Sequence, residues 1–153
     1  MKEAYNFVNK NAIQKSEATL IGFINSVKVD FIQYNYMQIN PLFVDDCIRL
    51  LSIRDIAAMK LTAIAQDGTR LKDFVDIAFL STKMSLKDML DAFELKFPKT
   101  NKMSAVKGLT YFDDIDFSVK IDLFKGKYKW KNIEKRLHEM TKYPDKIFSC
   151  DPV

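Results

Sequence analysis

The sequence predicts an α+β protein in which a small antiparallel β-sheet is followed by a C-terminal helical bundle. Two β-prone runs, ATLIGFI and VKVDFIQY, are separated only by Asn25 and Ser26. From Ser52 onwards, apolar residues recur at the spacing of amphipathic helices. The chain has 153 residues, of which 48% are hydrophobic, which is enough for one core. We therefore expect a sheet region over residues 1–51 and a helical bundle over residues 52–153, packed as one compact unit.

The sheet is expected to begin at Ala18, after a first dozen residues that resemble a loose lead-in. Asn25 and Ser26 fit a two-residue hairpin turn, although neither is glycine. In the second run, alternation separates two faces: Val27, Val29 and Phe31 on one, and Lys28, Asp30, Ile32 and Tyr34 on the other. Asp30 is then an acid in the middle of a strand, where aspartate either faces solvent or serves a site.

The helical part is expected to follow a short strand within residues 47–51. Helices are predicted over residues 53–67, 71–82, 85–97, 102–112 and 130–143. Ser52 and Ser85 are favourable N-caps for two of them. Lys87 and Asp91 are placed for an exposed i,i+4 ion pair. Trp130 is expected to anchor the last helix in the core.

One lysine and two aspartates occupy helix faces that a purely structural helix pair would keep apolar. Lys60 falls inside the apolar stripe of the first helix, so its ammonium needs an anion or a route to solvent. In the second helix, Asp73 and Asp76 are three residues apart and share one side with Lys72. Such carboxylates could hold a cation or orient a catalytic group. The simpler interpretation is a structural ion pair between Lys60 and Asp76 that joins the two helices.

Composition excludes several classes of protein and site. The formal net charge is +4, and lysines concentrate only over residues 125–135, which is weak evidence for a nucleic-acid interface. The four glycines form neither a P-loop nor a dinucleotide-binding fingerprint. The single histidine, His138, lies in a charged helical context, which argues against a histidine-based triad or metal site.

Cysteine content and hydropathy indicate a cytoplasmic protein without a membrane anchor. Cys47 and Cys150 are too few for a disulfide framework and lack metal-ligand spacing. No apolar run approaches the ~20 residues needed to span a bilayer. We therefore expect no membrane partner.

Four segments, taken in order, resemble one known family. They are GFINSVKVDFIQY, IRLLSIRDIAAMKLTAIAQ, RLKDFVDIAFL and GLTYFDDID, and together they resemble the AbiEii/AbiGii toxin family of nucleotidyltransferase-like proteins. The resemblance implies a nucleotidyltransferase sheet with an appended helical bundle, so the sheet of this chain would be an incomplete one. It also implies transfer of a nucleotide from a nucleoside triphosphate, GTP among the candidates, to an acceptor, with Mg²⁺ as cofactor.

The resemblance also implies roles for particular residues. Asp30 matches the family's strand carboxylate, which would be the third metal-site carboxylate. Lys60 matches the helix lysine, which would contact phosphate. Nucleotide transfer suits a site with paired divalent ions and a lysine ammonium, because these positive charges stabilise the negative charge that develops on phosphate oxygens.

The motif on the second helix extends this set. Asp73 and Asp76 match its acids, and one of them would orient Lys60 or assist the acceptor. Lys72 and Arg70 would join Lys60 in binding nucleotide phosphate. The implied catalytic residues are thus Asp30, Lys60, Asp73 and Asp76.

One family motif, a glycine-serine turn followed by a DxD pair on a strand, is not found in this chain. Asp114-Ile115-Asp116 spells DxD, but it follows a predicted helix and lacks that turn, so we do not expect it to be catalytic. We therefore expect the chain to correspond to the C-terminal two-thirds of a family member. Whether it is itself an enzyme stays open.

Three functions follow from these observations. The first is a nucleotidyltransferase-like toxin of a toxin–antitoxin or abortive-infection system, with an incomplete catalytic set. The second is a non-catalytic module that binds a nucleotide, a nucleic acid or a protein through Lys60, Asp73 and Asp76. The third is a helical interaction module with structural ion pairs. Expected partners are an antitoxin that regulates transcription and a second copy, paired through an exposed strand edge near residues 27–34.

Overall fold

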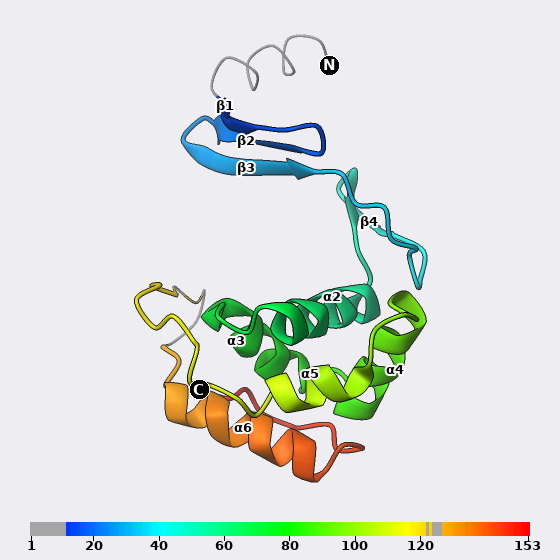
Figure 1. Ribbon diagram of the computed structural model, residues 1–153, viewed down its shortest axis with the longest axis vertical. Helices are drawn as coiled ribbons and strands as arrows, with labels where there is room; N and C mark the ends of the chain where they lie inside the picture. The colour runs from blue at the N-terminus through cyan, green and yellow to red at the C-terminus, as the bar shows by residue number, and fades with distance from the viewer. Residues whose placement is uncertain (1–11, 122, 124–126) are drawn as a thin grey trace. The chain divides into compact units, whose positions relative to one another are not determined.

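The structure is a computed structural model that describes residues 12–121, 123 and 127–153 (Figure 1). The chain divides into two compact units, Met1–Tyr36 and Met37–Val153. A three-stranded sheet lies in the first unit, and a two-stranded hairpin and a group of helices lie in the second. The predicted α+β class, a small antiparallel sheet followed by a helical bundle, is confirmed.

The sheet of the first unit has the order β1-β2-β3, with antiparallel neighbours. Its strands are β1 (Ala12–Lys15), β2 (Thr19–Ile24) and β3 (Val27–Ile32). The predicted turn joins β2 to β3, and Asn25 and Ser26 have φ values of 49° and 67°, as a type I′ turn requires.

Strand β1 was not predicted, since the sheet was expected to begin only at Ala18. Its sequence, AIQK, has no apolar–polar alternation, and pairing with β2 rather than local propensity makes it a strand. Of the expected lead-in, residues 1–11 lie outside the described residues.

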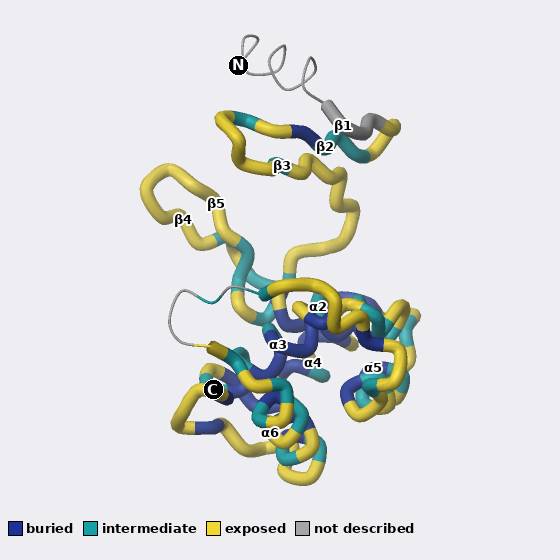
Figure 2. Tube along the Cα trace, turned by 90° about the vertical axis from the view of Figure 1, so that its left-hand side faces the viewer, coloured by how far each residue is buried: buried dark blue, intermediate teal, exposed yellow. Residues whose placement is uncertain are grey.

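The first strands of the second unit form a short hairpin, β4 (Phe43–Asp45) and β5 (Ile48–Leu50). The short strand predicted within residues 47–51 is therefore present, and β4 is its partner. Asp46 and Cys47 form the turn with φ values of 44° and 65°. Figure 2 shows that both strands are exposed.

The helices follow the predicted order. They are α2 (Ile53–Gln66), α3 (Leu71–Leu80), α4 (Leu86–Lys96), α5 (Lys102–Gly108) and α6 (Trp130–Lys142). The predicted N-caps are confirmed, since Ser52 accepts a hydrogen bond from the backbone of Asp55, and Ser85 from that of Asp88. The predicted Lys87–Asp91 pair does not form. The Lys87 ammonium lies 3.3 Å from Asp145 instead, because the segment after α6 returns to this helix.

Helix α5 is shorter than predicted and ends at Gly108. Glycine is a poor helix former, and the chain after it continues with single-turn hydrogen bonds, from Thr110 to Lys107 and from Tyr111 to Gly108.

The core of the second unit lies between the helices, where α2 packs against α3, α4 and α5, and α3 against α6. Figure 2 shows the buried residues on these inward faces. Trp130 packs against this core, as predicted, and stays partly exposed. Its ring makes edge contacts with Phe74, Phe112 and Phe117 at centroid distances of 6.4, 5.3 and 5.1 Å.

The division between the units lies after residue 36, whereas the sequence placed a division after residue 51 within one compact body. Hydrogen bonds to two helix residues explain why the intervening segment belongs with the helices. Asp55 accepts from the backbone N–H groups of Ile39 and Asn40, and Lys96 donates to the carbonyl of Met37.

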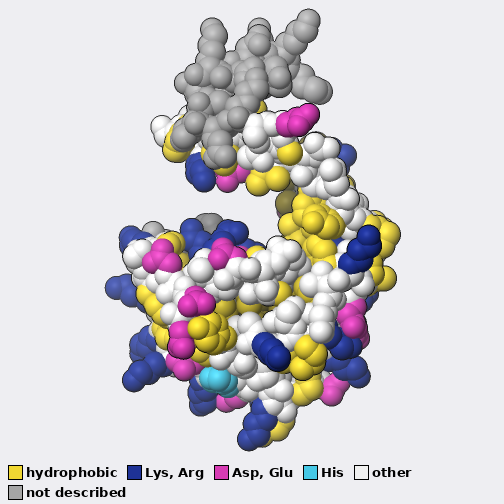
Figure 3. Space-filling model, viewed as in Figure 1, with side chains coloured by type: hydrophobic (Ala, Val, Ile, Leu, Met, Phe, Trp, Pro, Cys, Tyr) yellow, Lys and Arg dark blue, Asp and Glu magenta, His cyan; other side chains and the backbone are white. Residues whose placement is uncertain are grey.

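No helix in the described part of the chain combines the length and the apolar character needed to cross a membrane. On the face of the second unit shown in Figure 3, basic and acidic side chains are interspersed rather than gathered in one patch. This agrees with the dispersed lysines of the sequence.

Candidate functional site

Lys60 on α2 contacts both predicted aspartates of α3. Its Nζ atom lies 2.7 Å from Oδ1 of Asp73 and 2.7 Å from Oδ2 of Asp76. The two acids reach the same ammonium because residues three apart lie on the same side of a helix. Arg70, directly before α3, adds a second cation at 3.6 Å from Oδ2 of Asp73. We call Lys60, Arg70, Asp73 and Asp76 the Lys60 cluster.

The two acids differ in depth. The side chain of Asp73 is 2% exposed, whereas that of Asp76 is 48% exposed. Oδ2 of Asp73 is buried and accepts no hydrogen bond from the described residues. The positive charge of Arg70 lies 3.6 Å from this oxygen. The sequence placed Lys72 on the same side as both acids, but Lys72 is exposed and makes no ion pair with the cluster. Asp73 thus belongs to the interior and Asp76 to the surface.

Lys60 stays charged despite its partial burial. Burial pulls the pKa of Lys60 down, but the hydrogen bonds and negative charges of Asp73 and Asp76 outweigh it and raise the pKa above its usual value of 10.5. An ammonium has three donors, and two of them point to these carboxylates. With Arg70, the cluster contains two formal positive and two formal negative charges.

Asp30 lies in the other unit, in the middle of β3. It faces Ile21 of β2 across the sheet, and its carboxylate lies 3.5 Å from the Lys28 ammonium. The side chain is 39% exposed. The Lys60 cluster is formed without Asp30.

A hollow of about 400 Å³ lies beside Asp76. It is lined by Ile56, Asp76, Phe79, Leu80, Thr82, Lys83 and Asp151. Apolar side chains form one part of the wall, and Lys83 and Asp151 add one charge of each sign. Of these lining residues, the sequence predicted Asp76 alone as a site residue, and the fold brings Asp151 to this position from the far end of the chain.

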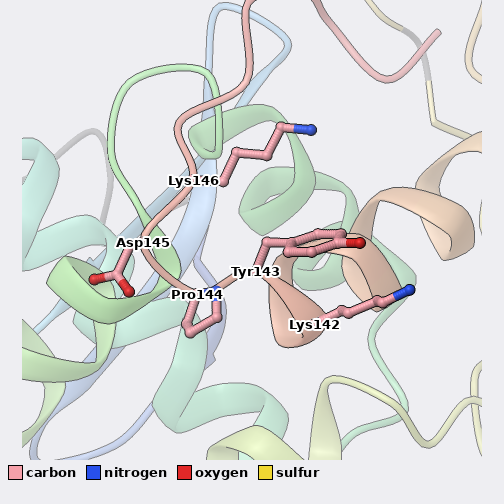
Figure 4. Close-up of a pocket in the computed structure, with 5 residues that line it drawn as sticks. All are labelled: Lys142, Tyr143, Pro144, Asp145 and Lys146. Carbon is pink, nitrogen blue, oxygen red and sulfur yellow. The ribbon is translucent and has the colours of Figure 1, made fainter.

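A second hollow, of about 640 Å³, is formed by the turn after α6 (Figure 4). Lys142, Tyr143, Pro144, Asp145 and Lys146 line it. The ammonium groups of the two lysines lie 5.2 and 5.9 Å from the centre of the Tyr143 ring, which is favourable for cation–π contact. None of the predicted site residues lies here.

A buried ion pair between Lys96 and Asp55 was not predicted from the sequence. Lys96 and Asp55 lie 2.7 Å apart with no exposed side-chain surface. Burial raises the pKa of Asp55, but hydrogen bonds from Lys96, Ser52 and two backbone N–H groups outweigh it and lower the pKa to about 2. Lys96 ends an apolar stripe that includes Met89 and Phe93, the same signal that identified Lys60.

Arg136 on α6 is another buried charge that the sequence did not reveal. Its guanidinium donates to the hydroxyl of Ser81 and to the carbonyl of Cys150, at 2.8 and 2.9 Å, and lies over the ring of Phe148. These contacts hold the C-terminal segment, which carries Asp151, against α3 and α6.

The described residues contain no group of three or more histidine, cysteine or acidic side chains that could hold a metal ion. The DxD-like segment does not provide one. Hydrogen bonds from the Ser118 hydroxyl and backbone hold the pKa of Asp116 below its usual value, and Ile115 between the two acids is buried. Those bonds fix Asp116 as part of a turn.

Comparison with known proteins identifies the family to which this chain is similar. A family model described as nucleotidyl transferase AbiEii toxin, type IV TA system, matches residues 21–146, which contain Asp30 and the whole Lys60 cluster. An uncharacterized protein of Aquifex aeolicus (strain VF5) is 33% identical over 126 residues, which are 80% of this chain and 59% of that relative. The chain thus spans less than two-thirds of that relative's length. No solved structure matches the chain.

Proposed function

The chain belongs to the AbiEii nucleotidyl transferase toxin family of type IV toxin–antitoxin systems, and we propose that its Lys60 cluster contacts the phosphates of a nucleoside triphosphate. Lys60 supports this proposal because two of its three donors are held by carboxylates while 27% of its side chain remains exposed. A lysine oriented in this way can direct its remaining donor to a phosphate oxygen without losing its own partners. Arg70, 63% exposed, supplies a second donor group beside it.

The depth of the two acids supports a division of roles. Asp73, which is buried between Lys60 and Arg70, is proposed as the positioning residue that fixes the lysine. Asp76 is half exposed and lines the hollow of about 400 Å³, so it is the proposed contact for the acceptor hydroxyl. A carboxylate can accept the hydrogen bond of a hydroxyl and assist its deprotonation.

Mg²⁺ is the cofactor that we propose for the complete family site, with Asp30 as one of its carboxylates. The described residues do not by themselves fit the ion, because Asp30 is paired with Lys28, and both Asp73 and Asp76 are paired with Lys60. Divalent ions in such sites are bound by carboxylates and by substrate phosphates together. We therefore assign no reaction step to a metal ion in this chain.

We propose nucleotide binding, rather than transfer by this chain alone, as its activity. The sequence contains no glycine-serine turn followed by DxD, and the described carboxylates form no metal-binding group. A binding module would use the same cluster without the chemical step. Family membership leads us to propose an antitoxin as the protein partner. The cytoplasm is the proposed location, since Cys47 and Cys150 are both free thiols.

The test is calorimetric titration of the protein with ATP, GTP, CTP and UTP in the presence of Mg²⁺. The proposal expects saturable binding of at least one triphosphate and its loss in Lys60→Met. Lys131→Met is the matched control, because Lys131 is an exposed lysine on α6 outside the cluster, and it should bind as the wild type does.

Loss of binding in Lys60→Met could also come from unfolding, because the substitution leaves Asp73 facing only Arg70. The double variant Lys60→Met/Asp73→Asn removes both charges and should keep the fold. If this folded variant binds nucleotide like the wild type, or if no triphosphate binds the wild type, the proposal is wrong.

A further inference from the structure

Strand β3 has one unpaired edge in the part of the chain that the structure describes. β2 pairs with its other edge along the whole strand, and β3 ends the three-stranded sheet. In a two-residue hairpin, the residues that flank the turn exchange both backbone hydrogen bonds. Val27, Val29 and Phe31 therefore direct their backbone groups to β2, and the bond from Gln33 to Ala18 continues this alternation. Lys28, Asp30 and Ile32 direct theirs to the open edge.

Apart from half-buried Val29, the residues of β3 are exposed on both faces of the sheet. On one face, Val27 is 63% and Phe31 is 50% exposed. On the other face, the side chains of Lys28 and Asp30 are 57% and 39% exposed. The open edge thus offers unpaired backbone groups, apolar surface and one charge of each sign.

We propose that β3 pairs with β3 of a second copy of this chain, antiparallel, around a two-fold axis at Val29. In this register, Lys28 lies opposite Asp30 of the second copy and Asp30 lies opposite its Lys28. On the other face, Val27 lies opposite Phe31 of the second copy, and Val29 opposite Val29. Each contact occurs twice, as a symmetric dimer interface requires.

The charge pattern is the reason for choosing a second copy as the occupant of this edge. A lone lysine on an edge strand opposes self-pairing, because two copies bring like charges together. Here an aspartate two residues later on the same face places opposite charges across the axis, and such cross-strand pairs stabilise a sheet. Moving the axis to Lys28 or to Asp30 would place that residue opposite its own copy, so the axis at Val29 is the one that gives opposite charges on both sides.

The backbone of β3 fits the same register. Lys28 and Asp30 direct their backbone groups to the open edge, so they would form the hydrogen-bonded pairs across the axis. Val29 would form the non-hydrogen-bonded pair with its own copy, where the Cα atoms approach to about 4.5 Å. Side-chain pairing and backbone pairing therefore require the same alignment.

The proposed dimer does not depend on the proposed nucleotide binding, but it affects Asp30. In the dimer, each Asp30 is engaged by Lys28 of the second copy. The carboxylate that family resemblance assigns to the metal site would then be held in a cross-strand ion pair.

Charge reversal combined with mixing tests the proposal. Sedimentation equilibrium between about 1 μM and about 1 mM should show a monomer–dimer equilibrium for the wild type. Lys28→Asp and Asp30→Lys should each weaken it roughly ten-fold, because each places two like-charged pairs across the axis. An equimolar mixture of the two variants should form a heterodimer again. The ion pair within one strand is lost in both variants, so only pairing between chains can explain that recovery.

Disulfide formation tests the register. With Cys47 and Cys150 replaced by serine, Val29→Cys should form a disulfide-linked dimer on mild oxidation. Lys28→Cys in the same background is the matched control, because its two copies would be too far apart for a disulfide.

Three results would overturn the proposal. They are a wild type that stays monomeric over the whole range, a mixture of the two charge variants that stays monomeric, and a Lys28→Cys variant that cross-links as readily as Val29→Cys. A monomeric wild type would leave the β3 edge to a strand of a different polypeptide.

Discussion

Asp55 and Lys96 are 41 residues apart in the chain, yet their charged groups meet at 2.7 Å and neither side chain is exposed. Asp55 lies in the first turn of α2 and Lys96 at the end of α4, so the pair joins these two helices. A buried ion pair is stable only when further hydrogen bonds compensate its loss of hydration. Here Ser52 and the backbone of residues 37–40 provide them.

Replacing one member of this pair should strongly destabilise the second unit. We expect Lys96→Met to lower its free energy of unfolding by about 3–5 kcal/mol, because Asp55 would remain buried with its charge unpaired. Urea denaturation followed by circular dichroism measures the change. Lys102→Met is the control, since Lys102 pairs with Glu94 at the surface and should cost less than about 1 kcal/mol. Equal costs for the two variants would contradict the assignment.

The same pair should make stability depend on acid pH. The pKa of Asp55 is about 2 in the folded chain and 3.8 when unperturbed. Its contribution, roughly 2 kcal/mol, is fully present above pH 3.8 and is lost as the pH falls through that value towards about 2. Thermal unfolding between about pH 5 and about pH 2 should show this loss, and Asp55→Asn should lack this part of it. An Asp55→Asn variant with the same pH dependence as the wild type would argue against the lowered pKa.

Asp73 and Asp76 should differ in their effects on stability, although both contact Lys60. We expect Asp73→Asn to cost about 1–3 kcal/mol, because a buried charged acceptor becomes a neutral amide. Asp76→Asn should cost less than about 1 kcal/mol, because its pair with Lys60 is half exposed. Chemical denaturation of the two variants in parallel measures both values. The reverse order would show that Asp76, not Asp73, is the structural member.

Replacing Gly108 by alanine should lower the stability of the protein, although helix propensity alone predicts an increase. A Cβ atom there would lie 2.9 Å from Cγ2 of Ile64 and 3.2 Å from its carbonyl oxygen. Helix propensity favours alanine over glycine by about 1 kcal/mol. Because α2 and α5 are in close contact at this point, we expect Gly108→Ala to destabilise the chain by about 1–3 kcal/mol instead. An increase in the melting temperature would show that the helices can move apart at no cost.

Local signals in the sequence predicted much of the fold. Ser52 and Ser85 begin their helices as expected because N-capping depends on hydrogen bonds within one helical turn. Asn25 and Ser26 form the predicted hairpin turn, which likewise depends on neighbouring residues. Strand β1 was not predicted, because pairing with β2 involves contacts that local patterns do not report.

The sequence predicted which residues form the Lys60 cluster, but not how deeply each of them is buried. Periodicity placed Lys60 on a buried face and put Asp73 and Asp76 on one side of the next helix. It could not show that Asp73 is buried and Asp76 half exposed, because that difference depends on how the neighbouring helices cover α3. The Lys96 position carried the same signal as Lys60, and only its partner, Asp55, lay too far away in sequence to be recognised.

The hydrogen bonds between residues 37–40 and the helices determine where the chain can be divided. A fragment that begins at Ser52 would remove the backbone groups that contact Asp55 and Lys96, leaving both charges short of partners. A fragment that begins at Met37 would retain them. Residues 37–40 therefore belong to the smallest fragment in which the helical unit keeps these hydrogen bonds.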